Sequence, residues 1–163
     1  RNIDFKTPIK KIVNSLLENE DDIIFLQEFT DNRYINVEKL FPEDKYIVNS
    51  NKLKSKSIVV AITLKGSSWK RIAPCSEDDY VNKFIEMNFN DKLSILSFQN
   101  TSDACKEKIN GHFKVEDKDI ILGDSNDINW VTELNINKGL GYRDLVTNDM
   151  ITYKPASVID YSR

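Results

Sequence analysis

Apolar positions follow a helical period in several parts of the chain. Near the N-terminus, a Thr-Pro pair suited to a helix start precedes an apolar stripe, which predicts an amphipathic helix over 7–18. A second amphipathic helix is expected at 103–113. Shorter helices are predicted at 34–41, which ends before Pro42, and near 130–138.

Other apolar runs indicate strands. DIIFLQEF (22–29) and DIILGD (119–124) are continuous rather than alternating, which predicts strands buried on both faces. Further strands are predicted at 45–50, 57–65, 68–73, 82–90, 93–99 and 157–162. Asn90-Asp91 is a hairpin turn signal between two of them. Helices and antiparallel strand runs alternate irregularly and no linker divides them, so we expect one α+β domain over 1–163, with helices covering the sheets.

Composition narrows the class of protein. The 163 residues are 40% hydrophobic and 30% charged, which supplies a core and excludes collagen-like and wholly disordered chains. No apolar run approaches the ~18 residues of a membrane span, and RNIDFKTP at the start contains no signal-peptide apolar region. We therefore expect an intracellular, cytoplasmic protein. A net charge of −3 argues against coating nucleic acid by bulk charge but allows a local basic groove.

Metal chemistry is limited by the few soft ligands. Two cysteines and one histidine do not make a usual zinc site, so a bound metal should be a hard cation with oxygen ligands. The histidine, His112, lies in a polar segment and is expected to be a plain surface residue.

Three acidic residues share a context at strand ends. Glu28 and Asp124 each end a continuous apolar run, and Asp160 lies in the last predicted strand. If these strands are neighbours, the carboxylates gather in one cleft, where they would bind a divalent cation or form a coupled acid pair. We expect the first two strands side by side or one strand apart, with both acids at one sheet end. The alternative is that each acid simply leaves the sheet into solvent.

The segment Gly-Asp-Ser-Asn at 123–126 could carry chemistry. The glycine permits a sharp turn out of the strand, and Asp124 and Asn126, two residues apart, can then face one cleft. The alternative is an ordinary turn rich in Asp and Asn.

Four short motifs in this order resemble the endonuclease/exonuclease/phosphatase superfamily. They are NID near the start, LQE after one apolar strand, GDSN after another, and IDY near the end, so the resemblance spans 2–161. It implies a four-layered α/β sandwich, with two mainly antiparallel sheets flanked by helices. It also implies cleavage of phosphate esters with Mg²⁺, for which Mn²⁺ can substitute.

The resemblance assigns roles residue by residue. Metal binding would fall to Glu28, Asn2 and Asp4. Asp124 would hold and activate the attacking water, and Asn126 would position that water and the phosphate. Asp160 would orient a catalytic histidine. Substrate binding would fall to Gln99 and the adjacent Asn100. Apart from the resemblance, Lys54 and Lys56 lie in a loop between predicted strands and could neutralise substrate phosphates, and the favoured alternative is a solvated hairpin.

The chain also departs from the family pattern. A final Ser-Asp-His segment and the first strand of the family are absent from the sequence, and Gln99 stands where His or Tyr is usual. We therefore expect a domain lacking the first and last strands. The favoured function is a Mg²⁺-dependent phosphodiesterase or nuclease, with nucleic acid as the expected partner and a phosphorylated small molecule as another. The alternatives are an inactive member acting as a binding module, and a phosphatase of lipid or inositol phosphates.

Overall fold

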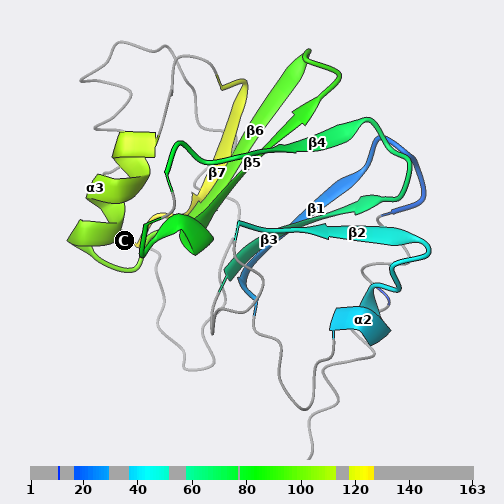
Figure 1. Ribbon diagram of the computed structural model, residues 1–163, viewed down its shortest axis with the longest axis horizontal. Helices are drawn as coiled ribbons and strands as arrows, with labels where there is room; N and C mark the ends of the chain where they lie inside the picture. The colour runs from blue at the N-terminus through cyan, green and yellow to red at the C-terminus, as the bar shows by residue number, and fades with distance from the viewer. Residues whose placement is uncertain are drawn as a thin grey trace, which may run out of the picture.

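A computed structural model describes residues 11, 17–29, 37–51, 58–76, 78–112 and 118–126. The expected helix at 130–138, the strand at 157–162 and most of the helix at 7–18 lie outside these residues. The other expected elements are confirmed, with ends shifted by a few residues. In chain order (Figure 1) they are β1 (Ile23–Phe29), α2 (Val37–Leu40), β2 (Tyr46–Asn49), β3 (Ile58–Leu64), β4 (Trp69–Ile72), the 3₁₀ helix η1 (Val81–Lys83), β5 (Phe84–Phe89), β6 (Leu93–Gln99), α3 (Asp103–His112) and β7 (Ile120–Asp124).

The described strands form two sheets. One has the order β1-β3-β2 and is antiparallel, and the other has the order β4-β5-β6-β7. In the second sheet β4, β5 and β6 are antiparallel, whereas β6 and β7 run parallel. A parallel neighbour requires a crossover rather than a hairpin, and α3 lies in that crossover between β6 and β7.

The two sheets pack face to face around β3. Its side chains are buried on both faces: Ile58, Val60 and Ile62 belong to an outer core, while Val59 and Ala61 point toward the second sheet. Ile85, Met87 and Ile95 of β5 and β6 meet them, with Trp69 of β4 at the border. The inter-sheet core is therefore mainly apolar, with the buried Ser97 beside it.

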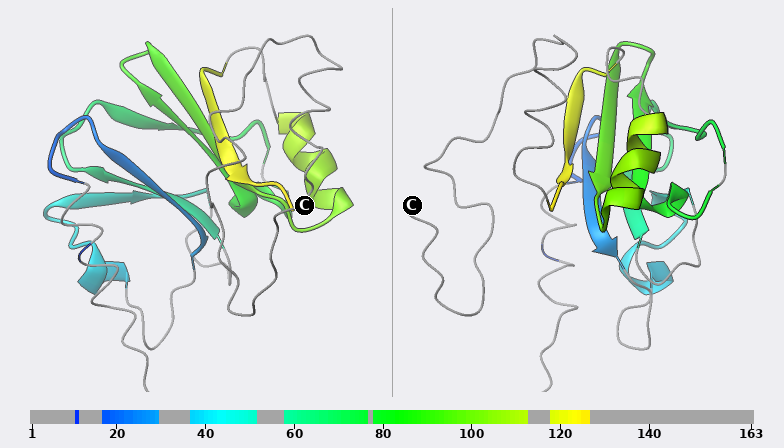
Figure 2. Two further views of the ribbon diagram at one scale, coloured as in Figure 1. Left: turned by 180° about the vertical axis from the view of Figure 1, so that it is seen from behind. Right: turned by 90° about the vertical axis from the view of Figure 1, so that its left-hand side faces the viewer.

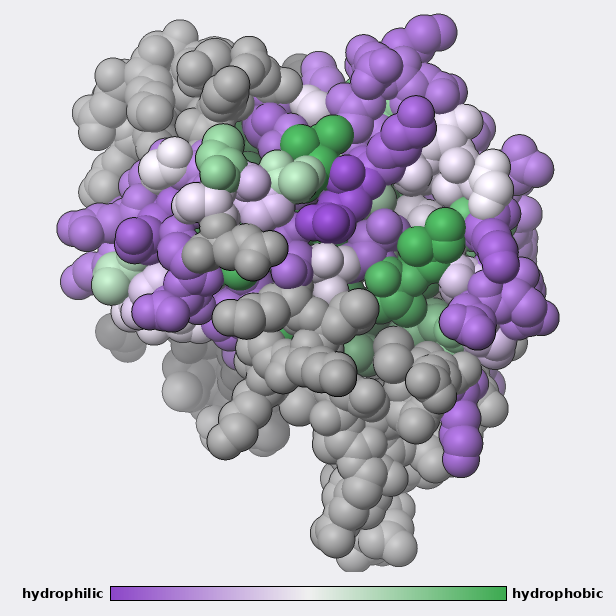
Figure 3. Space-filling view, in the orientation of Figure 1, coloured by the Kyte–Doolittle hydropathy of each residue, from purple (hydrophilic) through white to green (hydrophobic). Residues whose placement is uncertain are grey.

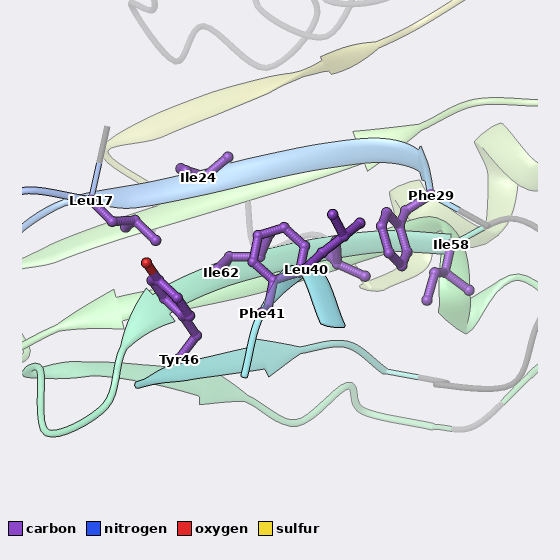
Figure 4. Packing of buried hydrophobic residues seen from close by; sticks show 9 residues of the cluster. Leu17, Ile24, Phe29, Leu40, Phe41, Tyr46, Ile58 and Ile62 are labelled. Carbon is purple, nitrogen blue, oxygen red and sulfur yellow. The ribbon is translucent and has the colours of Figure 1, made fainter. Parts of the chain in front are cut away.

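Two further cores cover the outer faces of the sheets. On the β1-β3-β2 sheet, Figure 4 shows Leu40, Phe41 and Tyr46 packed with Ile24, Phe29 and Ile62 on one side of the strands. On the other sheet, Cys105 and Ile109 of α3 pack on Phe84, Leu96 and Phe98. Figure 2 shows α3 on one side of β6 and β1 on the opposite side. Helical segments thus flank two mainly antiparallel sheets, and the expected four-layered sandwich is confirmed.

The hairpin between β5 and β6 turns where the sequence indicates. Asn90 and Asp91 have φ of 52° and 56°, and the Lys92 N–H donates to the Phe89 carbonyl at 2.9 Å. Two consecutive left-handed residues match the twist of the strands that they join, and Asn and Asp tolerate this conformation better than most residues.

His112 is not the plain surface residue that the sequence led us to expect. Its side chain is only 8% exposed, its ring lies 4.9 Å from that of Phe84, and its Nε2 is 2.9 Å from Asp78 Oδ2. The reason is helical spacing: Cys105, Ile109 and His112 stand at i, i+4 and i+7, on the face of α3 that covers the sheet.

The surface seen in Figure 3 is mostly polar, with small separate apolar patches. Among the described residues, the large apolar side chains with most exposure are Ile47 and Ile72, at 42% and 39%. Within the same residues, no helix combines the length and the apolar character that crossing a membrane requires.

Candidate functional site

Glu28 owes its position to a bulge in β1. Pairing with β3 is regular as far as Leu26↔Val60 and then shifts, so that Phe29 lies opposite Ile58. Simple alternation from Leu26 would send Glu28 into the outer apolar core. The bulge sends Phe29 there instead, and Glu28 is exposed with a left-handed φ of 53°. Left-handed backbone is unfavourable for most residues, by about 1–2 kcal/mol, and such strain often marks a functional position.

The Glu28 carboxylate meets the end of the opposite sheet. Its Oε1 accepts a hydrogen bond of 2.7 Å from Nε2 of Gln99, the last residue of β6. Gln99 is 1% exposed and follows Ile95 and Ser97 on the face directed toward β1. One residue earlier, Gln27 Nε2 donates to Ser97 Oγ at 3.3 Å. Two consecutive β1 side chains therefore bridge the two sheets.

Asp124 lies at the same end of the sandwich as Glu28. The β6–β7 register pairs Gln99 with Asp124, and the Asn100 N–H donates to the Asp124 carbonyl at 2.8 Å. The expectation that β1 and β7 are side by side or one strand apart is wrong, because they belong to different sheets. The expectation that both strands are buried on both faces is also wrong: β1 buries only Ile24 and Phe29, and β7 has no fully buried residue. A continuous apolar run therefore locates a strand but shows neither how deeply it is buried nor which strand it pairs with. The two acids still share one neighbour, since Gln99 bonds to Glu28 and pairs with Asp124.

Residues 124–126 form a turn stabilised by side chains. The Asn126 N–H donates to Asp124 Oδ1 at 3.0 Å, and Asn126 has a φ of 46°. Asn126 Nδ2 in turn donates to the Asn100 carbonyl at 2.6 Å. One Asp124 oxygen thus closes an Asx turn. Both Asp124 and Asn126 are exposed.

Asn100 holds this turn from the side of β6. It is 5% exposed, its Nδ2 donates to the Ser125 carbonyl at 2.9 Å, and its Oδ1 accepts from the Ser102 N–H at 3.3 Å. Both ends of its amide are therefore engaged within the protein. Little of the Asn100 or Gln99 side chain is left for direct contact with a substrate.

The glycine before Asp124 is required by close packing. A Cβ added at Gly123 would lie 2.1 Å from the Phe98 carbonyl oxygen, far inside van der Waals contact. Only glycine lets β7 approach β6 at this register, which brings Asp124 level with Gln99.

Among the described residues, Glu28 is the candidate ligand for a hard cation. The described residues contain no group of three or more His, Cys, Asp or Glu side chains placed to hold a metal. Glu28 offers a carboxylate that is exposed and already oriented by a hydrogen bond. Mg²⁺ retains several waters and is often held by only one or two carboxylates, so Glu28 fits the role of one ligand.

The other predicted site residues lie outside the described part of the chain. These are Asn2, Asp4, Lys54, Lys56 and Asp160. Their roles stay predictions. Sequence reasoning also missed the Gln27–Ser97 contact and the partner of Gln99. Alternation along β6 was the available signal, because Ile95, Ser97 and Gln99 must share a face.

Comparisons with known proteins bear on the fold. No family model matches the chain, and no curated protein matches it. Among solved structures, that of D. rerio TDP2 in complex with a single-strand DNA product aligns with a TM-score of 0.50 at 14% identity. The alignment covers 82% of this chain and 60% of that one, so this chain spans less than two thirds of the length of TDP2. At this identity the likeness shows the fold alone, a DNase I-like sandwich of two sheets flanked by helices.

Proposed function

We propose that the protein is a Mg²⁺-dependent phosphodiesterase of the endonuclease/exonuclease/phosphatase superfamily, acting on nucleic acid. The observation that carries the proposal is the hydrogen bond between Gln99 and Glu28, taken with the pairing of Gln99 and Asp124. Together they bring a metal-binding type of carboxylate and a second acid to one end of the sandwich. Each acid lies at the end of an apolar strand, in a motif that resembles those of this superfamily.

The structural neighbour supports the choice of substrate class. D. rerio TDP2 shares the fold and was solved with a single-strand DNA product. This supports nucleic acid as the first substrate to test, while a phosphorylated small molecule stays the second. The ammonium groups of Lys54 and Lys56 would neutralise backbone phosphates. Binding that depends on such contacts weakens as the salt concentration rises.

Each site residue has a distinct part in the proposed reaction. Glu28, with Asn2 and Asp4, would hold the cation. Bound Mg²⁺ supplies neutralisation of the charge on the phosphoryl oxygens. Asp124 takes a proton from the attacking water as general base, and Asn126 positions that water and the phosphate. Asp160 would orient a catalytic histidine that stabilises the phosphate, as the resemblance implies.

A second candidate function is a binding module without catalysis. It is favoured by the Asp124 Oδ1 atom, which accepts the Asn126 N–H and so already has a purely structural use. Gln99 is a second indication, because it stands where the superfamily usually has His or Tyr and its amide bonds to Glu28.

A substrate panel separates the two functions. Single-stranded DNA, abasic-site DNA, RNA and inositol phosphates are incubated with the protein in Mg²⁺, and in parallel with EDTA. The proposal predicts cleavage of a nucleic acid that EDTA abolishes and that Glu28→Gln strongly weakens. Binding of nucleic acid without cleavage in any condition would support the module instead.

A further inference from the structure

We propose that Gln99 is a positioning residue for Glu28: its buried amide fixes one carboxylate oxygen and thereby sets the affinity of the site for a divalent cation. This inference rests on the proposed function, because it deepens the role of Glu28. It differs from the role that the family resemblance gives this position, which is contact with the substrate.

The burial of Gln99 argues that it acts through Glu28. At 1% exposure, its side chain presents almost no surface to a phosphate approaching from solvent. Its Nε2 instead donates to Glu28 Oε1 at 2.7 Å, a short bond to an acceptor that carries charge. Hydrogen bonds of this kind are about twice as strong as those between neutral groups.

The amide comes from a rigid part of the second sheet. Gln99 ends β6, pairs with Asp124 of β7, and its carbonyl accepts a contact of 3.6 Å from the buried Cys105 thiol. Helix α3 is thereby attached to the same residue. Gln99 is therefore held by the sheet and by the helix, while the residue that it orients belongs to the other sheet.

Glu28 needs such an anchor more than an ordinary ligand does. It sits in a bulge with a φ of 53°, and its side chain is exposed. An exposed glutamate samples several rotamers, and a hydrogen bond from a fixed donor reduces that freedom before the cation arrives. Partners that orient a metal ligand typically change metal affinity by about 10–100-fold when they are removed.

Mn²⁺ titration calorimetry of the full chain tests the inference without relying on turnover. The variant is Gln99→Met, which keeps an unbranched side chain of similar length but removes the donor. The matched control is Gln27→Met, which removes the neighbouring bridge between the same strands, to Ser97, and leaves Glu28 untouched. We expect Gln99→Met to weaken Mn²⁺ binding about 10–100-fold and Gln27→Met to change it less than about 2-fold. Asparagine is one methylene shorter and withdraws the donor from Glu28, so Gln99→Asn should also weaken Mn²⁺ binding. It replaces Gln99→Met in the titration if Gln99→Met does not fold.

A double-mutant comparison shows whether Gln99 acts through Glu28. In a Glu28→Gln background, adding Gln99→Met should change Mn²⁺ affinity less than about 2-fold, because the carboxylate that it orients is gone. Equal Mn²⁺ affinity in wild type and Gln99→Met overturns the inference and leaves the proposed function intact. Equal weakening by Gln27→Met also overturns it, since the effect would then be general loosening of the sheets. A wild type that neither binds Mn²⁺ nor cleaves any substrate refutes the proposed function and this inference with it.

Discussion

Gln99 and Asp124 lie opposite each other in the parallel pair β6–β7, and each is the last residue of its strand. Because parallel strands end at the same end of a sheet, the chain segments that follow β6 and β7 begin close together. The Gln99 amide donates a hydrogen bond of 2.7 Å to Glu28, so the end of β1, in the other sheet, lies at the same place. Three separate chain segments thus converge on one buried glutamine.

Gly123→Ala should destabilise the fold strongly. The new methyl group would lie 2.1 Å from the Phe98 carbonyl oxygen, so β7 must move away from β6. We expect a loss of about 2–4 kcal/mol in the free energy of unfolding, as for other overpacked backbone contacts. Urea denaturation measures it.

Gly111→Ala is the control for that measurement. Gly111 lies in α3, and a Cβ added there meets nothing within 4 Å. Alanine is favoured over glycine in a helix, so this variant should gain up to about 1 kcal/mol. Similar losses in both variants would contradict the close packing of β7 on β6.

Asn100→Asp should loosen the turn at 124–126. The substitution replaces the Nδ2 donor with an oxygen that faces the Ser125 carbonyl, while the acceptor for the Ser102 N–H is kept. Two acceptors in a buried contact should cost about 1–3 kcal/mol of unfolding free energy. Thermal melts and urea titrations give the value.

Asn88→Asp provides the matched comparison for Asn100→Asp. Asn88 uses only its Oδ1 in the contact that the structure gives it, accepting the Asp91 N–H at 2.7 Å, and aspartate can do the same. We expect a change within about 0.5 kcal/mol. If both Asn→Asp variants lose the same stability, the clamp on the Ser125 carbonyl is not the cause.

The Asp78–His112 contact should make stability depend on pH in the acid range. Burial alone raises the pKa of Asp78, but hydrogen bonds from His112 and from the Tyr80 N–H bring the pKa below its ordinary value of 3.8. A lowered pKa means that the folded state favours the ionised form. The resulting stability is fully present above pH 3.8 and is lost as pH falls through the pKa of the folded state.

Asp78→Asn tests this linkage. Since the side chain is 19% exposed, we expect a loss of only about 1 kcal/mol in unfolding free energy at neutral pH. The difference from wild type should shrink as the pH is lowered toward about 3. Asp79→Asn, at the exposed neighbouring position, should show no such trend. A difference for Asp78→Asn that is constant across this range would refute the coupling.

The sequence revealed the elements better than their arrangement. The apolar pattern located β1, β7 and α3 because each packs apolar side chains against the cores, although those of β7 are only partly buried. It did not reveal the bulge that exposes Glu28. In a run that is apolar at every position both faces look alike, so a one-residue shift in register cannot be read from the pattern. It placed β1 and β7 in one sheet, although they belong to different sheets.

Part of the candidate site could also be predicted from the sequence. Acids after apolar runs indicated Glu28 and Asp124, which lie at one end of the sandwich and share Gln99 as a neighbour, although they belong to different sheets. The partner of Gln99 depends on how two sheets face each other, which no local pattern encodes. His112 was misjudged as a surface residue, although its spacing from Cys105 and Ile109 in the sequence would have placed it on the buried face of α3.

The rate of phosphodiester cleavage by Asp124→Asn, compared with wild type in Mg²⁺, tests the central claim most directly. Asparagine is nearly isosteric and can still accept the Asn126 N–H that Asp124 Oδ1 accepts, so the turn and the melting temperature should be kept. It cannot take a proton from water, and the account therefore predicts a fall of about 10²–10⁴ in rate. An unchanged rate in a normally folded Asp124→Asn protein would contradict the account and reduce Asp124 to a turn residue.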